Sequence, residues 1–382
     1  MRILFWSELF WPYIGGVETL SVKLIPALRK RGYEVIVVTS HHYLDLPDGA
    51  QYEGIPVYRF PFRAALATRN VDQLVEVRQR VANLKRTFTA DLVHINAVGP
   101  SVLFHLHTHK AHPAPSLVTM HQGNLPTEPV RRDTLLTQTL RSANWVTCVS
   151  SAMLAYVRQL VVETVPRSSV IYNSLEVLRL LPTPLPIEAP RLLCLGRLIP
   201  RKGFDLALTA FASLVDRFPR ARLVIAGDGP ARPELEGQAA ALSLADRVDF
   251  VGWVAPDKVP ELMNTATVVV VPSREEGFGL VALEAALMAR PVVATRVGGL
   301  PEVVVHQQTG LLVEPDDSAT LAEAIALLLA HPETAAQMGE AARHRAQELF
   351  SWDRCVDAYA ALYRTLTKES GHGESGRSAA SQ

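Results

Sequence analysis

The chain has 382 residues, of which 48% are hydrophobic and 20% are charged, and its 38 basic residues balance 38 acidic ones. This length and composition exclude an intrinsically disordered protein and favour two domains, each with a sizeable core. A basic stripe with interleaved aromatic residues is not found, which argues against a nucleic-acid-binding protein.

Short apolar strands alternate with helices throughout the sequence. Strands are expected at residues 2–6, 34–39, 92–95, 117–120, 145–149, 191–195, 222–226, 248–251, 268–271 and 291–295. Helices are expected at residues 17–31, 71–88, 101–110, 204–217, 233–242 and 319–365. This alternation predicts an α/β fold with doubly wound parallel sheets that carry helices on both faces.

A proline-rich stretch at residues 181–190 interrupts the alternation and is expected to be a linker. The predicted organisation is an N-terminal Rossmann-like domain, residues 1–175, and a second Rossmann-like domain, residues 176–351. Residues 367–382 are polar and rich in Gly and Ser, which predicts a disordered tail. Two such domains facing each other would form a cleft at the carboxyl ends of their strands, where such sheets bind ligands.

The two halves of the chain differ in charge. Residues 1–175 contain 18 Lys and Arg against 12 Asp and Glu, whereas residues 176–382 contain 20 against 26. This difference favours the first half as the one that meets an anionic partner, and an accidental asymmetry is the alternative. The three cysteines lack metal-ligand spacing, the N-terminus lacks a signal-peptide pattern, and no apolar run reaches the about 18 residues of a membrane span. We expect a cytoplasmic protein, with peripheral attachment to the inner membrane face as an alternative.

Residues 272–286, P-S-R-E-E-G-F-G-L-V-A-L-E-A-A, join a strand to an apolar helix pattern. If the helix begins at Glu276, the carboxylates of Glu276 and Glu284 lie about 12 Å apart along its axis on nearly one side. That spacing suits a ligand with two polyhydroxylated ends and a charged middle, such as a nucleotide-sugar, whose phosphate would lie at the helix N-terminus. A surface helix with a capping Glu is the alternative.

A second strand–helix junction, residues 193–203, reads L-C-L-G-R-L-I-P-R-K-G. Its loop presents Arg197 and Lys202, and a diphosphate would suit these two cations because Arg grips phosphate oxygens in a fork and Lys acts as a point charge. A solvated basic loop is the alternative. The turn A-G-D-G-P at residues 226–230 is interpreted as structural.

Two junctions in the first half are further candidates. Gly15 and Gly16 precede the first helix, where backbone N–H groups could meet a phosphate. His121 follows a strand and could bond a sugar hydroxyl or contribute to charge stabilisation, and His94 and Asn96 have a similar position with weaker support. Glycine turns and a structural histidine are the alternatives.

A metal site is not expected. His105 and His109 have the i, i+4 spacing of a zinc pair on a helix, but a third ligand is not evident. Asp316-Asp317 is interpreted as the N-cap of the following helix.

The motifs G-G-V-E, T-M-H-Q-G, I-Y-N-S, G-R-L-I-P-R-K-G, A-G-D-G-P and E-G-F-G-L-V-A-L-E-A occur in this order between residue 2 and about residue 365. Together they resemble the retaining nucleotide-sugar glycosyltransferases of glycosyltransferase family 4, which have the GT-B fold of two facing Rossmann-like domains. The resemblance implies that a C-terminal helix at about residues 352–366 packs back on the N-terminal domain.

The resemblance also implies roles for residues. Arg197 and Lys202 would hold the donor diphosphate and stabilise it as it leaves, and Glu276 and His121 would contact the donor sugar. Glu284 would bind the ribose hydroxyls. Further donor contacts would come from Gly15, Gly16, Gly277, Phe278, Gly279 and Leu280. The implied reaction is transfer of a hexosyl group from a UDP- or GDP-sugar to a hydroxyl of a glycan, a lipid or a small molecule, with retention and without metal or cofactor.

Alternatives from other classes remain open at this stage. An epimerase or phosphorylase could use the same architecture, and a non-catalytic protein could bind a nucleotide-sugar. A nicotinamide oxidoreductase is disfavoured because the first strand–turn lacks the dinucleotide glycine fingerprint. Acceptor recognition is expected in loops at residues 40–69 and 124–132. The basic segment 78–86 could meet anionic lipid or an acidic acceptor, although a solvated helix face is the favoured interpretation.

Overall fold

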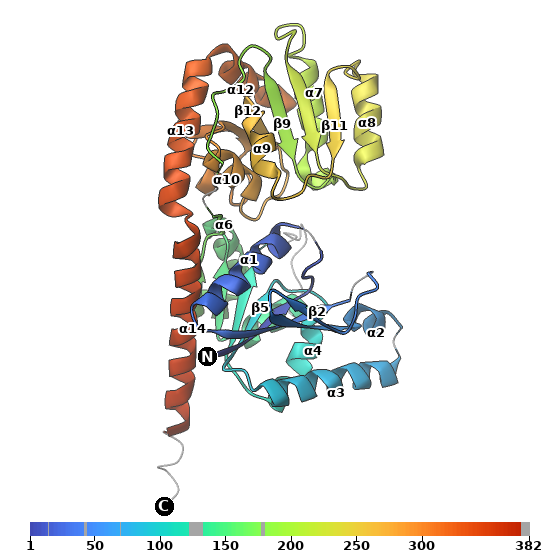
Figure 1. The fold of residues 1–382 in the computed structure, drawn as a ribbon, viewed down its shortest axis with the longest axis vertical. Coiled ribbons are helices and arrows are strands. Elements are labelled where there is room, and N and C mark those ends of the chain that lie inside the picture. Colours follow the sequence, from blue (N-terminus) through green and yellow to red (C-terminus); the bar gives the residue numbers. More distant parts are fainter. Residues whose placement is uncertain (14, 42–43, 69, 122–132, 177–179, 376–382) are drawn as a thin grey trace, which may run out of the picture. The chain divides into compact units, whose positions relative to one another are not determined.

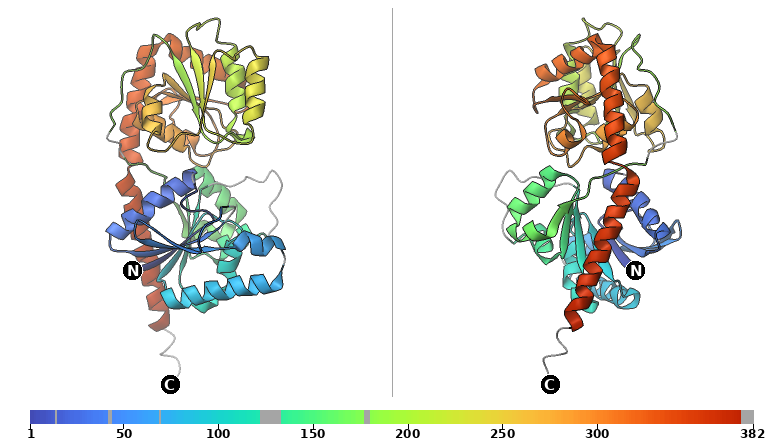
Figure 2. Two further views of the ribbon diagram at one scale, coloured as in Figure 1. Left: turned by 45° about the vertical axis from the view of Figure 1, so that its right-hand side comes forward. Right: turned by 90° about the vertical axis from the view of Figure 1, so that its left-hand side faces the viewer.

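The computed structural model describes residues 1–13, 15–41, 44–68, 70–121, 133–176 and 180–375. The chain divides into two compact units, one made of Met1–Tyr172 with Asp353–Gln382 and the other of Asn173–Trp352. Each unit is a mostly parallel sheet with helices on both faces (Figures 1 and 2). Among the described residues, no helix is both long and apolar enough to cross a membrane.

The first unit contains an eight-stranded sheet in the order β3-β4-β2-β1-β5-β6-β7-β8. Its strands are β1 (Arg2–Ser7), β2 (Glu34–Ser40), β3 (Gly49–Tyr52), β4 (Ile55–Phe60), β5 (Leu92–Asn96), β6 (Ser116–Met120), β7 (Trp145–Cys148) and β8 (Ser168–Val170). All neighbouring strands are parallel except β3 and β4, which form an antiparallel pair at one edge. The strand order reverses between β1 and β5: the strands that follow β1 in sequence are added on one side of it, and those from β5 onward on the other.

The helices of the first unit cover the sheet in two layers. They are α1 (Gly16–Lys30), α2 (Phe62–Thr68), α3 (Val71–Phe88), α4 (Val102–His107), α5 (Leu135–Ser142), α6 (Ser151–Leu160) and α14 (Trp352–Ser375), with 3-10 turns η1 (His109–Ala111) and η2 (Val162–Arg167). Alternation along β1 points Leu4 and Trp6 into one core, which α2 to α6 complete. Phe5 points to the other face, where its ring meets that of His94.

The C-terminal helix α14 is part of the first unit from Asp353 onward. The hydroxyl of Tyr363 lies 2.6 Å from Nδ1 of His94, and the hydroxyl of Tyr33 donates to the carbonyl of Ala360 at 3.1 Å. Arg31 forms ion pairs with Asp353 and Asp357 at the solvent side. The helix continues to Ser375, whereas disorder was expected from residue 367, and residues 376–382 lie outside the described part.

The second unit contains a six-stranded, all-parallel sheet in the order β11-β10-β9-β12-β13-β14. Its strands are β9 (Arg191–Leu195), β10 (Arg222–Ala226), β11 (Val248–Gly252), β12 (Val268–Val271), β13 (Val292–Thr295) and β14 (Gly310–Val313). The four valines of β12 are all buried, as expected for a strand covered on both faces. The order reverses between β9 and β12.

Eight helical segments surround this second sheet in the described part of the chain. They are η3 (Pro200–Lys202), α7 (Phe204–Ala212), α8 (Arg232–Ala241), α9 (Val259–Asn264), α10 (Leu280–Leu287), α11 (Leu300–Val303), α12 (Ser318–Ala330) and α13 (Pro332–Leu349). The core on one face joins β9, β10 and β12 to α7, α8 and α12. Asp317 accepts hydrogen bonds from the amides of Ala319 and Thr320, which confirms the predicted N-cap of α12.

The proline-rich stretch is not a linker between the units. The amide of Thr183 donates to Asn264, and the hydroxyl of Thr267 donates to the carbonyl of Pro186 at 2.8 Å. Leu185 packs against the core of the second unit. The stretch therefore belongs to that unit, and the division of the chain lies earlier, between Tyr172 and Asn173.

Several short elements were not predicted. Residues 40–69, expected as acceptor loops, contain the β3–β4 pair and α2, and the edge strands β8 and β14 were also missed. The helix expected at residues 101–110 is α4 followed by the separate turn η1. The second expected acceptor loop, residues 124–132, lies outside the described residues.

Candidate functional site

The candidate site of the second unit lies where its strand order reverses. The loops that follow β9 and β12 leave the carboxyl ends of adjacent strands whose connections run in opposite directions. Open α/β sheets bind ligands in the crevice at such a switch point. The two loops are residues 196–203 and 272–279, the same two segments that the sequence singled out by their charges and glycines.

The two loops are in close contact. A Cβ added at Gly203 would lie 1.9 Å from the carbonyl oxygen of Pro272, and Gly203 has a φ of +67° as it caps α7. Only glycine fits both the conformation and the space at this position. The glycine thus brings the end of the β9 loop against the start of the β12 loop.

Lys202 and Glu276 meet across this contact. The Nζ of Lys202 lies 2.5 Å from Oε2 of Glu276, and the two side chains are only 20% and 16% exposed. The sequence suggested a phosphate ligand for one residue and a sugar ligand for the other, but did not suggest this ion pair. Arg197, on the same loop as Lys202, is exposed, and no ion pair is found for it among the described residues.

The sequence predicted that the helix begins at Glu276, but Glu276 lies before it. Helix α10 begins at Leu280, and Gly279 caps it with a φ of +107°. The expected separation of Glu276 and Glu284 along one helix axis is therefore wrong. Glu284 is the half-buried fifth residue of α10, whereas Glu276 lies in the turn before it, with Gly277 and Phe278 between the turn and the cap.

A third loop supports this turn and was missed from the sequence. A Cβ added at Gly298 would lie 1.7 Å from the carbonyl oxygen of Glu276, and one at Gly299 would lie 2.7 Å from that of Gly277. Both glycines follow β13, the strand next to β12. The signal available in the sequence was the V-G-G turn at residues 297–299, which has the same strand–glycine–helix pattern as the other two loops.

The turn A-G-D-G-P after β10, interpreted as structural, lies against a neighbouring loop. A Cβ at Gly227 would lie 1.8 Å from the carbonyl oxygen of Gly196, and one at Gly229 would lie 2.4 Å from that of Leu198. The turn therefore packs against the backbone of the loop that carries Arg197 and Lys202.

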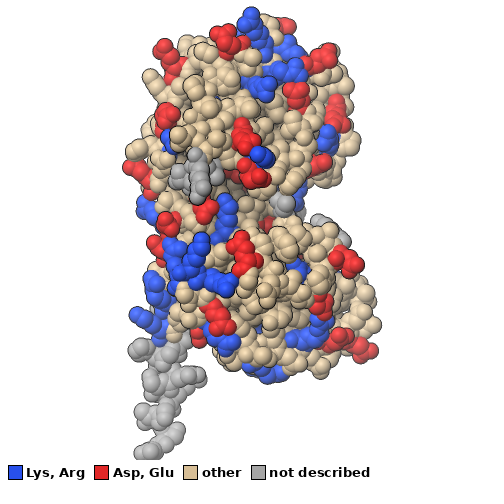
Figure 3. Space-filling view, viewed as in Figure 1, with Lys and Arg blue, Asp and Glu red and all other residues tan. Residues whose placement is uncertain are grey.

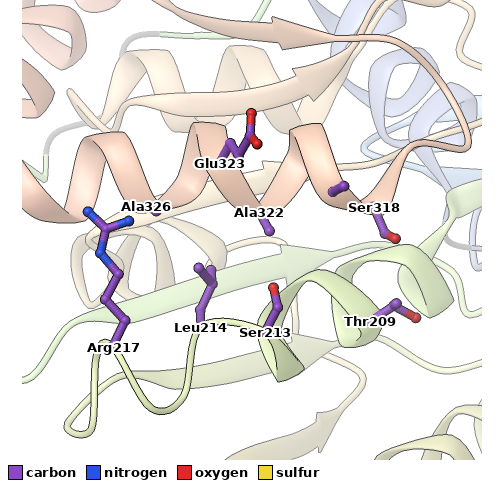
Figure 4. Close-up of a pocket in the computed structure, with 9 residues that line it drawn as sticks. Thr209, Ser213, Leu214, Arg217, Ser318, Ala322, Glu323 and Ala326 are labelled. Carbon is purple, nitrogen blue, oxygen red and sulfur yellow. The ribbon is translucent and has the colours of Figure 1, made fainter.

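The second unit also has a groove of about 420 Å³ between α7 and α12 (Figure 4). Its lining includes Ser213 and Arg217 on one side and Ser318 and Glu323 on the other. It shares no residue with the loops at the switch point. We therefore keep the switch point as the candidate site.

In the first unit, His121 is buried directly after β6. Its Nε2 donates to the side-chain oxygen of Asn96 at 2.7 Å, and the amide nitrogen of Asn96 donates to Ser21 of α1 at 2.8 Å. Nδ1 of His121 has no hydrogen-bond partner among the described residues. Burial lowers the pKa of His121 from 6.5 to about 4, so the ring is neutral near pH 7. Such a ring offers a hydrogen-bond acceptor and supplies no positive charge.

The other candidates of the first unit divide into two groups. Gly15 caps α1 and Gly16 is its exposed first residue, so the expected helix N-terminus is present there. His94 instead lies inside β5, fully buried, with Nε2 2.8 Å from Thr119, and burial lowers its pKa to about 3. The expectation that His94 follows its strand, as His121 does, is wrong, and Asn96 is the last residue of β5.

The histidine pair considered for zinc lies on two separate elements. His105 is buried in α4 beside Nζ of Lys85, whereas His109 lies in η1. Among the described residues, no group of three potential metal ligands is found.

The basic segment 78–86 also differs from a lipid-binding face. Lys85 is buried, and Arg80 is paired with Asp48. On the face shown in Figure 3, Lys and Arg atoms are interspersed with Asp and Glu atoms. The segment therefore gives no support to attachment at an anionic membrane.

Comparisons with known proteins agree with the fold. Residues 14–177 match the family described as "Glycosyltransferase Family 4", and residues 182–345 match "Glycosyl transferases group 1". The chain is 36% identical over 179 residues to the alpha-D-kanosaminyltransferase of Streptomyces kanamyceticus, which is 47% of this chain and 46% of that protein. It is 40% identical over 173 residues to the GDP-mannose-dependent alpha-(1-6)-phosphatidylinositol monomannoside mannosyltransferase of Mycobacterium tuberculosis, which is 44% of this chain and 45% of that protein.

The matches to these two relatives thus span about half of their length. A likeness over nearly the whole chain comes from the solved structure of sucrose-phosphate synthase from Thermosynechococcus elongatus. It has a TM-score of 0.83 and 26% identity, and the match covers 97% of this chain and 100% of that one. The chain belongs to the glycosyltransferases of the family 4 type, with the GT-B fold, and the expected resemblance is confirmed.

Proposed function

We propose that the chain transfers a hexosyl group from a nucleoside-diphosphate sugar to a hydroxyl acceptor, with retention of anomeric configuration and without a metal ion. The observation that carries the proposal is the Lys202–Glu276 pair, joined at 2.5 Å across the switch point of the second sheet. A cation and a carboxylate held side by side suit a ligand in which a diphosphate adjoins a sugar.

The chemistry follows from the charges on these loops. Breaking the bond between the sugar and the diphosphate develops negative charge on the leaving oxygen. The ammonium of Lys202 has three N–H donors, so it can keep Glu276 and still donate to diphosphate oxygens. Arg197 is exposed on the same loop and adds a two-pronged phosphate donor. Two fixed cations would then neutralise the leaving group in place of a metal ion.

The remaining donor contacts are proposed from the resemblance to the family. Glu276 would accept hydrogen bonds from sugar hydroxyls while it holds Lys202, and the amides from Gly277 to Leu280 would lie near the phosphate. Glu284 would accept from the ribose hydroxyls. In the first unit, the first turn of α1 at Gly15 and Gly16 would take an anionic group, and Nδ1 of His121 would accept a hydrogen bond from a hydroxyl.

The proposal includes more than one donor base and more than one class of acceptor. The two relatives named above differ, by their names, in both the sugar and the acceptor. UDP- and GDP-sugars are both suitable donors for the proposed site, and a glycan, a lipid or a small molecule can each present the acceptor hydroxyl. We place the protein in the cytoplasm, where nucleotide-sugars are available.

A transfer assay tests the proposal. Purified protein is incubated with UDP-glucose, UDP-N-acetylglucosamine or GDP-mannose, a panel of acceptors and excess EDTA, and products are detected by mass. We expect one donor to give a product whose anomeric configuration matches the donor. Lys202→Met should lower kcat/KM by about 100-fold or more, because a charge on the leaving group loses its partner.

The matched control is Lys258→Met. Lys258 also pairs with a glutamate, Glu261, at 2.9 Å, but on an exposed face of α9. Its loss should leave kcat/KM within about twofold of the wild type, as for most surface pairs. Full activity of Lys202→Met, or an absolute need for a metal ion, would contradict the proposal. Sugar conversion without any acceptor would favour an epimerase or a phosphorylase.

A further inference from the structure

Arg274 joins the two loops of the candidate site and was not singled out by the sequence. It lies on the loop after β12, two residues before Glu276. Its amide donates to the carbonyl of Arg201 at 2.8 Å, and its Nη1 donates to the carbonyl of Pro200 at 2.7 Å. These two carbonyls belong to the residues immediately before Lys202.

The guanidinium of Arg274 is also held from two other sides. Nη1 and Nη2 donate to the two carboxylate oxygens of Asp205 at 2.8 and 2.7 Å, and Nε donates to Asp316 at 2.6 Å. Asp205 is in the first turn of α7, and Asp316 lies after β14. The hydrogen bond from Arg274 is the main cause that lowers the pKa of Asp205, so this carboxylate stays ionised.

These contacts use four of the five N–H groups of the guanidinium. Arg274 is therefore committed to protein acceptors and is not a cation that is open to a phosphate. Its effect on a ligand must pass through the residues that it holds, and these flank Lys202 on one loop and Glu276 on the other.

We propose that Arg274 is a positioning residue, whose bonds to Pro200, Arg201 and Asp205 hold Lys202 and Glu276 at the spacing that binds the donor diphosphate. This rests on the proposed function. With the loops fixed in advance, less conformational freedom is lost on binding. The planar fork of the guanidinium supplies several directed bonds at once, so a lysine cannot replace it.

The chain contains a matched control for an Arg–Asp fork. Arg222 of β10 donates to both carboxylate oxygens of Asp249 of β11, at 3.0 and 2.7 Å, with exposure similar to that of the Arg274–Asp205 pair. Arg222 is the first residue of its strand, so it lies at the end of the sheet opposite to the candidate site. Arg222→Lys therefore removes the same chemistry without touching the two loops.

The first test measures the dissociation constants of UDP and GDP. We expect Arg274→Lys to weaken the tighter nucleotide by tenfold or more, and Arg222→Lys to leave it within twofold. In a Lys202→Met background, Arg274→Lys should have less than a twofold further effect, because UDP and GDP carry no hexosyl group for Glu276 to bind and the diphosphate ligand that Arg274 positions, Lys202, is gone. An unchanged affinity in Arg274→Lys, or an equal loss in both backgrounds, would overturn the inference.

The second test needs no ligand. The amides of Lys202, Gly203 and Arg274 are hydrogen-bonded within the two loops at 2.9, 3.0 and 2.8 Å, so their exchange with deuterated water reports opening of the loops. Arg274→Lys should speed their exchange in the full chain at least tenfold, and Arg222→Lys should not. Unchanged exchange would overturn the inference. If the wild type binds neither UDP nor GDP, the proposed function fails, and this exchange alone decides whether Arg274 holds the loops.

Discussion

At the scale of single residues, the candidate site depends on glycines that let three loops approach one another. Gly203 lies against Pro272, and Gly298 lies against the backbone of Glu276. In each case a side chain would have to displace backbone atoms. Lys202 and Glu276, 74 positions apart, become partners only because these approaches are possible.

Replacing Gly298 should therefore move Glu276. Gly298 has a φ of +50°, and an added Cβ would lie 1.7 Å from the carbonyl oxygen of Glu276. We expect Gly298→Ala to lower the free energy of unfolding by about 1–3 kcal/mol and to weaken nucleotide binding. Gly237→Ala is the control, since Gly237 lies in α8 with open space around it and should gain about 0.5–1 kcal/mol. Equal effects of the two substitutions on binding would refute this explanation.

His121 gives a second prediction at this scale. The bond from Nε2 to Asn96 fixes the proton on that nitrogen, and burial keeps the pKa at about 4. Nitrogen-15 NMR should show a neutral ring protonated at Nε2 from pH 8 down to pH 5.5. Asn96→Asp should raise the pKa of His121, because a neighbouring carboxylate stabilises the charged ring. A wild-type ring that titrates between pH 6 and 7, or one protonated at Nδ1, would contradict the structure.

At the scale of secondary-structure elements, the sequence predicted the strands that have a clear apolar pattern. It did not predict the edge strands or the contacts between loops, which depend on how the strands pair. Apolar strands such as β12, all of whose residues are buried, can be predicted from their composition alone. The edge strand β8 has only three residues, too few for a periodic pattern, and the four-residue edge strand β14 begins with a glycine. The glycines and charges of the loops marked the candidate site, but the contacts of Lys202 and Arg274 depend on the order of strands in the sheet, which no local pattern contains.

The packing of α3 against α4 makes the stability of the first unit depend on pH. Lys85 is buried beside His105, and desolvation lowers its pKa from 10.5 to about 7. Between these values the unfolded chain binds more protons than the folded one, so stability falls as pH drops from about 10.5 to 7. Burial also lowers the pKa of His105, which extends the loss below pH 6.5.

Lys85→Met should accordingly stabilise the first unit at pH 7 by an amount on the order of a few kcal/mol, and should flatten the pH dependence above pH 7. Urea denaturation at pH 7 and pH 9.5 measures both effects. Lys110→Met, at an exposed position nearby, should change stability by less than about 0.5 kcal/mol at either pH. A destabilised Lys85→Met variant would show that the hydrogen bond from Nζ of Lys85 to the carbonyl of His105, at 3.1 Å, outweighs the cost of burying the ammonium.

At the scale of the whole molecule, each unit has its own sheet and its own core, and the C-terminal helix belongs to the first unit although it follows the second in sequence. Tyr363 of α14 is fully buried and lies 2.6 Å from His94 inside the first sheet. In the second unit, the rings of Phe350 and Phe278 pack edge to face at 5.4 Å. Each aromatic residue therefore stabilises one unit.

Large-to-small substitutions should show whether the two units lose stability independently of each other. We expect Tyr363→Ala to lower the stability of the first unit, and Phe350→Ala that of the second, each by about 3–5 kcal/mol. Hydrogen exchange of the full chain localises the loss: the strands of the first sheet should lose protection in one variant and those of the second sheet in the other. Loss of protection in both sheets with either variant would mean that the chain unfolds as one cooperative unit.

The most direct test of the central claim, that the Lys202–Glu276 pair marks a donor site, is calorimetric titration with UDP-glucose, UDP-N-acetylglucosamine and GDP-mannose in the presence of EDTA. We predict that the wild type and Lys258→Met bind one of them with equal affinity, and that Lys202→Met binds it at least about tenfold more weakly. Equal binding by all three proteins would place the donor elsewhere. Binding by none of them would contradict a nucleotide-sugar site at this switch point.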